Sequence, residues 1–274
     1  MKGDNIMIRF LKLLILITSF LVIIGRSEAR AHSLNNTIYI TNDDKSIMLS
    51  KMSLNKKERK IVFLTFDDGP SEVNTKGILE ILTKNNIKAS FFIIGKSGER
   101  NKEILKELGK KGMAVYPHSY SHEYEEIYKN TESYFKDLNL CEEVIKKHVS
   151  GVNKPYMRMP GGSANSVCNK VILKSIKDQL REKNYSYIDW NVDSQDATSR
   201  RVSAERIKRS VFKESTYNSI SVVLFHDTES KDTTVEALED VIKYYKNNNY
   251  QFKTLNEITQ KEEKILIDMK VINR

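Results

Sequence analysis

The sequence predicts an α/β fold, a distorted or incomplete (β/α) barrel of seven or eight units that forms a single domain. Short apolar runs alternate with helical stretches across residues 60–258, which indicates a mainly parallel sheet with covered faces. A length of 274 residues is ordinary for one such domain. Hydrophobic residues make up 39%, with only 4 prolines and 11 glycines, which excludes collagen-like and low-complexity chains.

The expected strands and helices follow one another along the chain. Strands are expected at 61–66, 89–94, 113–116, 156–159, 185–192, 221–225 and 251–255. Helices are expected between them at 74–86, 101–111, 131–148, 167–183, 203–214 and 231–248. The last helix begins with Asp232, Thr233 and Thr234, which are typical of a helix N-cap.

Residues 1–31 have the layout of an export segment. An apolar run at 10–25 is preceded by basic residues and followed by Ala-Arg-Ala at 29–31, as in a secretory signal peptide. The alternative is an uncleaved membrane anchor. Lys12 interrupts the run, which is shorter than the ~20 residues needed to span a bilayer, so cleavage is favoured. In both cases the remaining chain is expected outside the cytoplasm, secreted or anchored to the membrane on its extracytoplasmic side.

The rest of the chain divides into three parts. Residues 32–58 are polar and rich in Asn, Ser and Lys, and we interpret them as a linker. The domain itself is expected at 59–260, followed by a C-terminal tail at 261–274. Cys141 and Cys168 are too few for a disulfide scaffold and too far apart for a C-x-x-C site. Whether they pair stays open, and neither is expected to be catalytic.

The charge balance excludes one class of partner. The formal net charge is +9, of which residues 1–31 contribute +3 and residues 32–274 contribute +6. This excess suits solubility or an anionic partner such as a cell-wall polymer, a membrane surface or nucleic acid, and it selects none of them. Basic and acidic residues are interspersed, and no basic stripe alternates with aromatic residues, so we expect no nucleic-acid binding. We expect a monomer that contacts a membrane only through residues 10–25, and only if these residues are not cleaved.

Polar residues of catalytic types follow directly after five of the expected strands. The loops at the carboxyl ends of parallel strands converge in barrels, so these groups are expected to meet. In chain order they are TFDDGP at 65–70, HSYSH at 118–122, RMPGGS at 158–163, DSQD at 193–196 and LFHD at 224–227.

The two histidines of the second group suggest a metal site. His118 and His122 are four residues apart, so one helical turn would place both imidazoles on one face, a spacing that zinc sites use. Taken alone, the pair could equally lie on the surface. Asp68 would supply a carboxylate ligand. Two His and one Asp leave positions open for water and substrate, which is the condition for a catalytic site.

The adjacent carboxylates of the first group have two interpretations. Asp-Asp-Gly-Pro is good turn chemistry, with Gly69 free to take a positive φ. However, neighbouring carboxylates at a barrel mouth repel each other unless one meets a cation. If Asp68 binds the metal ion, Asp67 lies close enough to take a proton from water there.

Together, the five groups resemble the polysaccharide deacetylase family, also called carbohydrate esterase family 4 or the NodB-homology domain, over roughly residues 60–258. The resemblance implies hydrolysis of N-acetyl groups on an amino sugar with one divalent metal ion. It implies Asp68, His118 and His122 as metal ligands and Asp67 as general base. Zinc is the expected metal, although cobalt, manganese, nickel and iron accept the same ligands.

The resemblance implies roles for four further residues. His226 would be the general acid that protonates the leaving amine. Leu224 would line the small cavity for the acetyl methyl group. Arg158 would orient or screen Asp67. Asp196 would pair with Arg158 or with His226, and the sequence does not decide between these two partners.

Two positions depart from the family pattern. Gly161 stands where relatives often have Tyr, and Ala197 stands where they often have Trp. A backbone N–H after the third motif can still serve an oxyanion, but we expect a wider and less aromatic substrate groove. Trp190 is the single tryptophan, and it either belongs to the core or faces the groove and stacks on a sugar.

We therefore expect an exported deacetylase of cell-wall glycan, acting on the N-acetylglucosamine of peptidoglycan. The Asp67–Asp68 pair resembles the glucosamine-type enzymes. Chitin oligomers, another surface polysaccharide and muramic acid residues are alternative substrates, and an acetyl-xylan esterase would use the same machinery. Outside this class, the alternatives are a non-catalytic glycan-binding protein that keeps the barrel, and an iron oxygenase with two His and one carboxylate, for which no co-substrate motif is identifiable.

Overall fold

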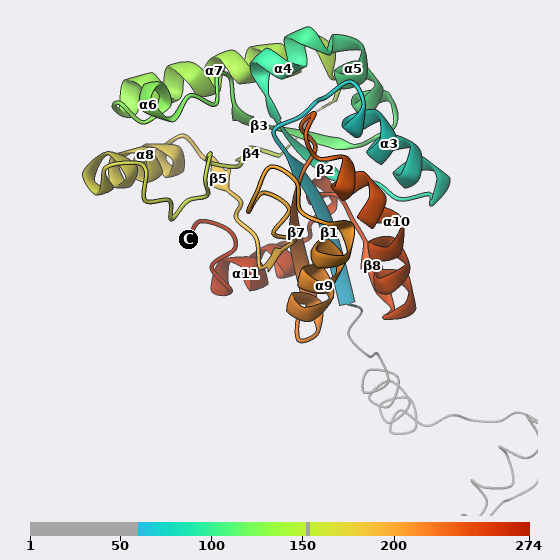
Figure 1. Ribbon diagram of the computed structural model, residues 1–274. Coiled ribbons are helices and arrows are strands. Elements are labelled where there is room, and N and C mark those ends of the chain that lie inside the picture. The colour runs from blue at the N-terminus through green and yellow to red at the C-terminus, as the bar shows by residue number, and fades with distance from the viewer. Residues whose placement is uncertain (1–59, 152–153) are drawn as a thin grey trace, which may run out of the picture. The chain divides into compact units, whose positions relative to one another are not determined.

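The computed structural model describes residues 60–151 and 154–274. Within them, strands alternate with helices through most of the chain, as the sequence predicted (Figure 1). The expected leader at 1–31, the expected linker at 32–58 and residue 59, where the domain was expected to begin, lie outside the described residues. No helix of the described part is long and apolar enough to cross a membrane.

The described strands are β1 (Lys60–Asp67), β2 (Ser90–Ile94), β3 (Ala114–Ser119), β4 (Tyr156–Met157), β5 (Ser186–Tyr187), β6 (Val192–Asp193), β7 (Ile220–His226) and β8 (Tyr250–Phe252). The described helices are α3 (Asn74–Lys84), α4 (Gly95–Arg100), α5 (Lys102–Lys110), α6 (Tyr124–Ile127), α7 (Thr131–His148), α8 (Lys170–Glu182), α9 (Ala204–Ser215), α10 (Asp232–Asn247), the 3₁₀ turn η1 (Leu255–Glu257) and α11 (Gln260–Asp268).

The strands form two parallel sheets. The larger sheet has the order β3-β2-β1-β7-β6, and β8 pairs with the first residues of β1. The smaller sheet contains β4 and β5. No ladder of strand pairs joins the two sheets within the described residues. The fold is therefore the incomplete barrel that the sequence predicted.

Strand β1 shows how the sequence sets the two faces of the larger sheet. Side chains alternate along a strand, so Phe66 packs into the core beneath the helices while Phe63 packs into the core inside the barrel. The same alternation turns Asp67 to the inner side. In the parallel register Asp67 lies beside His226 of β7 and Phe92 of β2. Two predicted site residues thus become neighbours through strand pairing alone.

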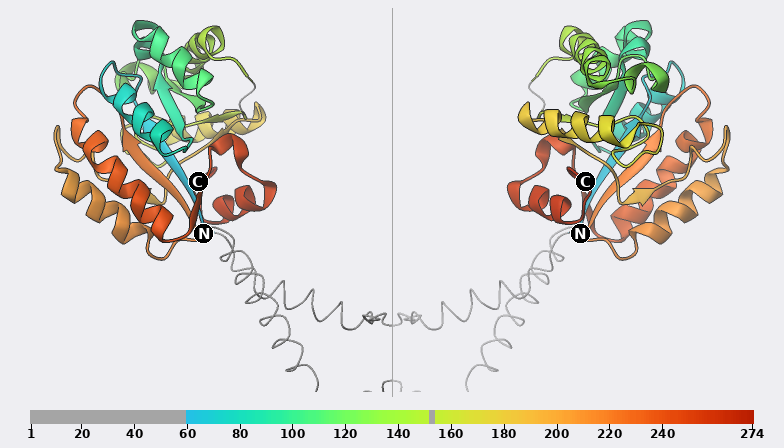
Figure 2. Two further views of the ribbon diagram at one scale, coloured as in Figure 1. Left: turned by 90° about the vertical axis from the view of Figure 1, so that its right-hand side faces the viewer. Right: turned by 90° about the vertical axis from the view of Figure 1, so that its left-hand side faces the viewer.

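Helices cover the outer face of the larger sheet. Helices α9 and α10 lie side by side over β6, β7 and β8, as Figure 2 shows, and α3, α5 and α7 continue this layer over β2 and β3. Large apolar side chains such as Ile78 of α3 and Val241 of α10 are fully buried against the sheet. Each such burial stabilises the fold by about 1.5–3 kcal/mol.

The strand expected at 185–192 is wrong as one continuous element, because β5 ends at Tyr187 and β6 begins at Val192. Asn191 explains part of the break. Its side-chain oxygen accepts a hydrogen bond from the Val222 N–H at 2.7 Å, and its amide nitrogen donates to the Ile220 carbonyl at 2.8 Å. These side-chain bonds replace ladder bonds to β7, a substitution that an apolar pattern does not reveal.

The C-terminal segment also differs from expectation. Residues 261–274 were expected to form a tail beyond the domain, but α11 and the residues after it pack on the inner core. Leu266 and Ile272 are fully buried, and Ile272 forms an antiparallel bridge with Ile188. A capping box at Thr259 and Glu262 begins the helix. The folded domain therefore continues to the end of the described chain.

Two smaller expectations are settled by the described residues. Helix α10 begins after Lys231 with no side-chain cap, so the expected capping role of the residues at 232–234 is wrong. Asp232 instead pairs with Arg201 at 2.9 Å. Cys141 and Cys168 are both buried free thiols.

Candidate active site

The five polar groups meet at the carboxyl ends of the strands, around an open cavity of about 420 Å³. Asp67, Asp68, His118, His122 and His226 all line it, together with Gly161, Leu224 and Trp190. The two other residues singled out from the sequence, Arg158 and Asp196, lie behind this lining and are almost fully buried.

Asp68, His118 and His122 form a cluster suited to a metal ion. Asp68 Oδ1 lies 3.4 Å from His118 Nε2 and 3.3 Å from His122 Nε2. The ligand atoms of the three residues lie within 4.8 Å of one another. Asp68 Oδ1 is buried and has no hydrogen-bond partner, an arrangement that is costly unless a cation satisfies it. The donor set fits a divalent cation.

The protonation of His118 also fits a ligand. Its Nδ1 lies 2.8 Å from the Arg158 carbonyl, which can only accept, so Nδ1 carries the hydrogen of this bond. The lone pair of Nε2 is then directed toward Asp68, the arrangement that orients metal-binding histidines. Burial lowers the pKa of His118, against the opposing charges of Asp67 and Asp68. The neutral imidazole, which is the ligand form, is therefore favoured.

The helical turn expected at His118 and His122 is wrong. Strand β3 continues to Ser119 and thus contains His118, whereas His122 lies in the following loop with a φ of 59°. The His122 N–H donates to Ser119 Oγ at 2.9 Å. The Asp137 carboxylate accepts from the backbone N–H groups of residues 120 and 121 at 2.7 and 3.0 Å. A strand end and a clamped loop, rather than one helix, bring the two rings to 5.2 Å.

The turn after β1 also differs from expectation. Asp68 itself, and not Gly69, has the positive φ, at 75°. This conformation is uncommon for a residue with a side chain, and such strain is concentrated at functional sites. Gly69 is required for a different reason, since a Cβ there would lie 2.2 Å from Oδ2 of the buried Asp227. The turn therefore combines a strained metal-ligand candidate with a close approach of backbone to carboxylate.

Arg158 pairs with Asp67 in the interior. Its guanidinium donates to Asp67 Oδ1 at 2.7 Å and to Thr65 Oγ1 at 2.9 Å, and Arg158 is fully buried. Further bonds run to the carbonyls of Ile188 and Asp189, at 2.9 and 3.1 Å. The second Asp67 oxygen, Oδ2, lies 4.0 Å from the metal-ligand candidate His118. One carboxylate oxygen is thus held, and the other faces the ligand cluster.

Asp196 pairs with His226 and not with Arg158, which answers the question left open by the sequence. Asp196 Oδ1 lies 2.7 Å from His226 Nδ1, and Oδ2 accepts from the His226 N–H at 2.8 Å. Thr234 Oγ1 also donates to Oδ2, at 2.8 Å. Burial lowers the pKa of His226, but the hydrogen bond and charge of Asp196, with smaller contributions from nearby carboxylates, raise it overall to about 9.

The walls of the cavity combine small and aromatic residues. Leu224 is buried with its side chain on the cavity surface. Trp190 is partly buried, packs against the inner core and also lines the cavity, so both interpretations of this residue hold in part. Its ring edge lies 3.0 Å from the position that a Cβ on Gly162 would occupy. Gly161 and Gly162 have φ values of 74° and 81°, which favour glycine.

Three residues around the site carry no signal in the sequence. Lys231 is buried and its Nζ donates to the carbonyls of Asp196 and Ser199 at 2.8 and 3.1 Å. The Asp189 carboxylate accepts from the N–H and hydroxyl of Ser163 at 2.9 and 2.6 Å, which holds the glycine turn. Tyr124 lines the cavity beside His122. Only its position two residues after a predicted ligand could have drawn attention to it.

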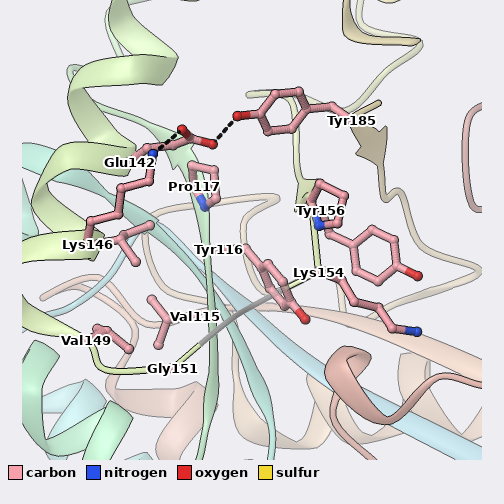
Figure 3. Close-up of a pocket in the computed structure, with 12 residues that line it drawn as sticks. Val115, Tyr116, Pro117, Glu142, Lys146, Val149, Gly151, Lys154, Tyr156 and Tyr185 are labelled. Atoms are coloured by element: carbon pink, nitrogen blue, oxygen red, sulfur yellow. Dashed lines mark hydrogen bonds and ion pairs between the residues drawn. The ribbon is translucent and has the colours of Figure 1, made fainter. Parts of the chain in front are cut away.

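A separate cavity of about 360 Å³ lies between β3, the end of α7 and β4 (Figure 3). Its rim includes Tyr185, whose hydroxyl donates to Glu142 at 2.5 Å, and Glu142 also pairs with Lys146 at 3.1 Å. Tyr116 and Tyr156 stand next to each other at its other side, with ring centroids 5.9 Å apart. It contains none of the residues singled out above, so we do not count it as part of the active site.

Comparisons with known proteins agree on one family. The model of the family described as polysaccharide deacetylase matches residues 54–177. Two peptidoglycan-N-acetylglucosamine deacetylases of Bacillus cereus are similar to this chain. One is 27% identical, covering 81% of this chain and 80% of that protein, and the other is 32% identical, covering 74% and 70%. The crystal structure of the catalytic domain of a peptidoglycan N-acetylglucosamine deacetylase from Eubacterium rectale is 33% identical, with a TM-score of 0.67, covering 74% of this chain and 91% of that one.

Proposed function

The chain belongs to the polysaccharide deacetylase family, and from this premise we propose that it is a metal-dependent N-deacetylase acting on the N-acetylglucosamine of peptidoglycan. The substrate named for the relatives supports this choice. The observation that carries the proposal is the grouping of Asp68, His118 and His122 between two buried ion pairs, Arg158 with Asp67 and Asp196 with His226.

Asp67 serves as the general base in this proposal. Arg158 holds Oδ1, which fixes the orientation of the carboxylate, and Oδ2 faces the ligand cluster. A water molecule that attacks the acetamide carbonyl carbon from this side gives its proton to Oδ2. Gly161 also lines the cavity, and its N–H would stabilise the oxyanion that forms.

His226 serves as the general acid. Because its pKa is raised to about 9, the imidazole is protonated at neutral pH, and Asp196 holds Nδ1 so that Nε2 is free to act. When the carbon–nitrogen bond of the acetamide breaks, His226 gives its proton to the sugar nitrogen. The products are acetate and a free amine. Asp67 then releases its proton to solvent and His226 takes one up from solvent, which restores the starting state of the site.

Asp68, His118 and His122 would hold one divalent cation, which we propose to be zinc. Such a cation polarises a carbonyl oxygen and lowers the pKa of a water in its coordination sphere. Leu224, at the cavity surface, would contact the acetyl methyl group, and Trp190 would contact a sugar ring.

We propose that the domain works outside the cytoplasm at the cell wall, as a monomer. This rests on the apolar run at 10–25 with its basic flank and on the net charge of residues 32–274, which suits an anionic polymer. The expected boundaries, with a leader at 1–31 and a linker at 32–58, belong to the same proposal, and mass spectrometry of the mature N-terminus tests them.

The function is tested by measuring acetate release from purified peptidoglycan with zinc or cobalt added. We expect acetate together with an equal amount of new free amines, and neither product with Asp67→Asn or His122→Ala. Asp232→Asn, an exposed carboxylate bonded to Arg201, is the matched control and should keep full activity. Acetate without amines would indicate an esterase. No acetate from peptidoglycan but activity on chitin oligomers would replace the proposed substrate, and no activity on either would favour a glycan-binding protein.

A further inference from the structure

One wall of the active-site cavity is built by a residue outside the five sequence groups. Gly161 has no side chain, and the space in front of it is occupied by Tyr124 of α6. The Tyr124 hydroxyl lies 3.3 Å from the position that a Cβ on Gly161 would take, and its ring carbon Cε1 lies at 3.4 Å. Asn165 Cβ is also 3.3 Å from this position, but of the two side chains it is Tyr124 that lines the cavity and shapes this wall.

Packing fixes the ring of Tyr124 from two sides. The ring meets His122 edge-on, with centroids 5.2 Å apart, and lies nearly parallel to the ring of Tyr128 at 6.1 Å. Tyr128 is itself buried and donates to the Pro160 carbonyl at 2.8 Å, just before the glycine turn. A ring held in this way presents its hydroxyl in a fixed direction, which favours recognition over mere filling of space.

The hydroxyl of Tyr124 is free for a ligand. Within residues 60–151 and 154–274 it has no hydrogen-bond partner on the protein, and neither has the N–H of Gly161 beside it, whereas the Gly162 N–H donates to the Met159 carbonyl at 2.8 Å. Two unpaired donors therefore lie next to each other on the cavity wall.

We propose that Tyr124 is a specificity-determining residue that touches the substrate: its ring forms the wall beside Gly161, and its hydroxyl donates a hydrogen bond to an oxygen of the acetylated sugar. This inference rests on the proposed function, since it assigns a contact to the same N-acetylated glycan. It adds a contact from α6, which none of the five sequence groups contains.

The test compares Tyr124→Phe and Tyr124→Ala with the wild-type protein in acetate release from N-acetylglucosamine oligomers and peptidoglycan. Loss of one hydrogen bond predicts a KM raised about fivefold in Tyr124→Phe, with kcat within twofold. Tyr124→Ala, which also removes the wall, should raise KM further. Tyr244→Phe is the matched control, because that hydroxyl donates to the Phe212 carbonyl between α10 and α9, outside the cavity, and its loss should leave KM unchanged.

Two further readouts separate recognition from structure. Trp190 is the only tryptophan and lines the same cavity, so its fluorescence reports binding of an N-acetylglucosamine tetramer to the metal-free protein. We expect weaker binding for Tyr124→Phe, with an unchanged unfolding midpoint and unchanged zinc affinity, because the hydroxyl supports no protein group. The inference would be overturned if Tyr124→Phe had the same KM and the same oligomer affinity as the wild type. It would also be overturned if a lower zinc affinity of the variant accounted for its higher KM. A wild-type protein that neither releases acetate nor binds the oligomer would overturn the proposed function itself, and the inference with it.

Discussion

Removing the Asp196 carboxylate should change the proton affinity of His226. The pair is joined at 2.7 Å, with Asp196 fully buried and the His226 side chain 16% exposed. Burial lowers the pKa of His226, but the bond and charge of Asp196 outweigh it and raise the pKa from 6.5 to about 9. Asp196→Asn removes the negative charge that raises the pKa of His226 and leaves the effect of burial, which lowers it. We therefore expect the pKa of His226 to fall toward or below 6.5.

The magnitude follows from linkage between protonation and folding. A pKa raised from 6.5 to about 9 corresponds to roughly 3 kcal/mol of stabilisation of the protonated folded state. Because the folded pKa lies above the unfolded one, this stabilisation is fully present below about pH 6.5 and is lost as the pH rises through 9. Between pH 6.5 and pH 9 the free energy of unfolding of the wild type should therefore fall by on the order of 3 kcal/mol more than that of Asp196→Asn.

Two assays on the metal-free protein measure this effect. Imidazole NMR titration is tractable because the chain has 5 histidines, and urea unfolding at several pH values gives the stability difference. Asp232→Asn, in which an exposed carboxylate is lost, is the control and should leave the pKa of His226 near 9. A pKa near 9 in Asp196→Asn, or the same pH dependence of unfolding in both proteins, would refute the assignment. In the active enzyme, Asp196→Asn should move the alkaline limb of kcat to lower pH.

Three other perturbations test the surroundings of the site. Arg158→Met should lower the free energy of unfolding by about 3–5 kcal/mol, because the Asp67 carboxylate stays buried without its cationic partner. Lys84→Met is the control, since it removes only a surface ion pair with Glu239. Equal urea midpoints for the two variants would contradict the predicted stability difference. Zinc should raise the thermal midpoint of the chelator-treated wild type, and the same rise in Asp68→Asn would speak against that ligand. Lys231→Met should release the loop that carries Asp196, the partner of the proposed acid His226. We expect a lower kcat and an alkaline limb of the kcat–pH profile shifted to lower pH, with KM within twofold. An unchanged pH profile would show that the lysine has only a packing role.

Much of the fold was accessible from the sequence because hydrophobic periodicity reports burial directly. Helix α7 has the expected bounds, and β1, β2 and β7 agree within two residues at each end. Elements held by side-chain bonds or by tertiary contacts were missed. The break at Asn191 depends on an amide that imitates backbone, and α11 depends on a capping box and on Leu266, which docks against distant residues. The Thr259–Glu262 spacing is a local helix-start signal, but neither the role of the Asn191 amide nor the docking of Leu266 leaves a local pattern.

The grouping of the site was predictable for a different reason. Parallel strands end at the same edge, so the residues after β1, β3 and β7 must converge whatever the details of the loops. Local geometry did not follow in the same way. His118 and His122 were expected on a helical turn because their spacing allows it, yet the strand continues through His118 and a clamped loop brings in His122. Spacing fixes which residues can meet, but several backbone paths satisfy one spacing.

Charge compensation explains why the carboxylates of the site are not equivalent. Asp67 has the guanidinium of Arg158, and Asp196 has the imidazolium of His226. Asp227 is fully buried, and burial raises its pKa to about 7, so it carries much less than a full charge at neutral pH. Asp68 is left with a buried oxygen that no hydrogen-bond donor of the described residues reaches. The charge of Asp68 is therefore the one that the protein itself does not compensate, and it lies beside the ring nitrogens of His118 and His122. A divalent cation bound there lowers the electrostatic energy of the site most.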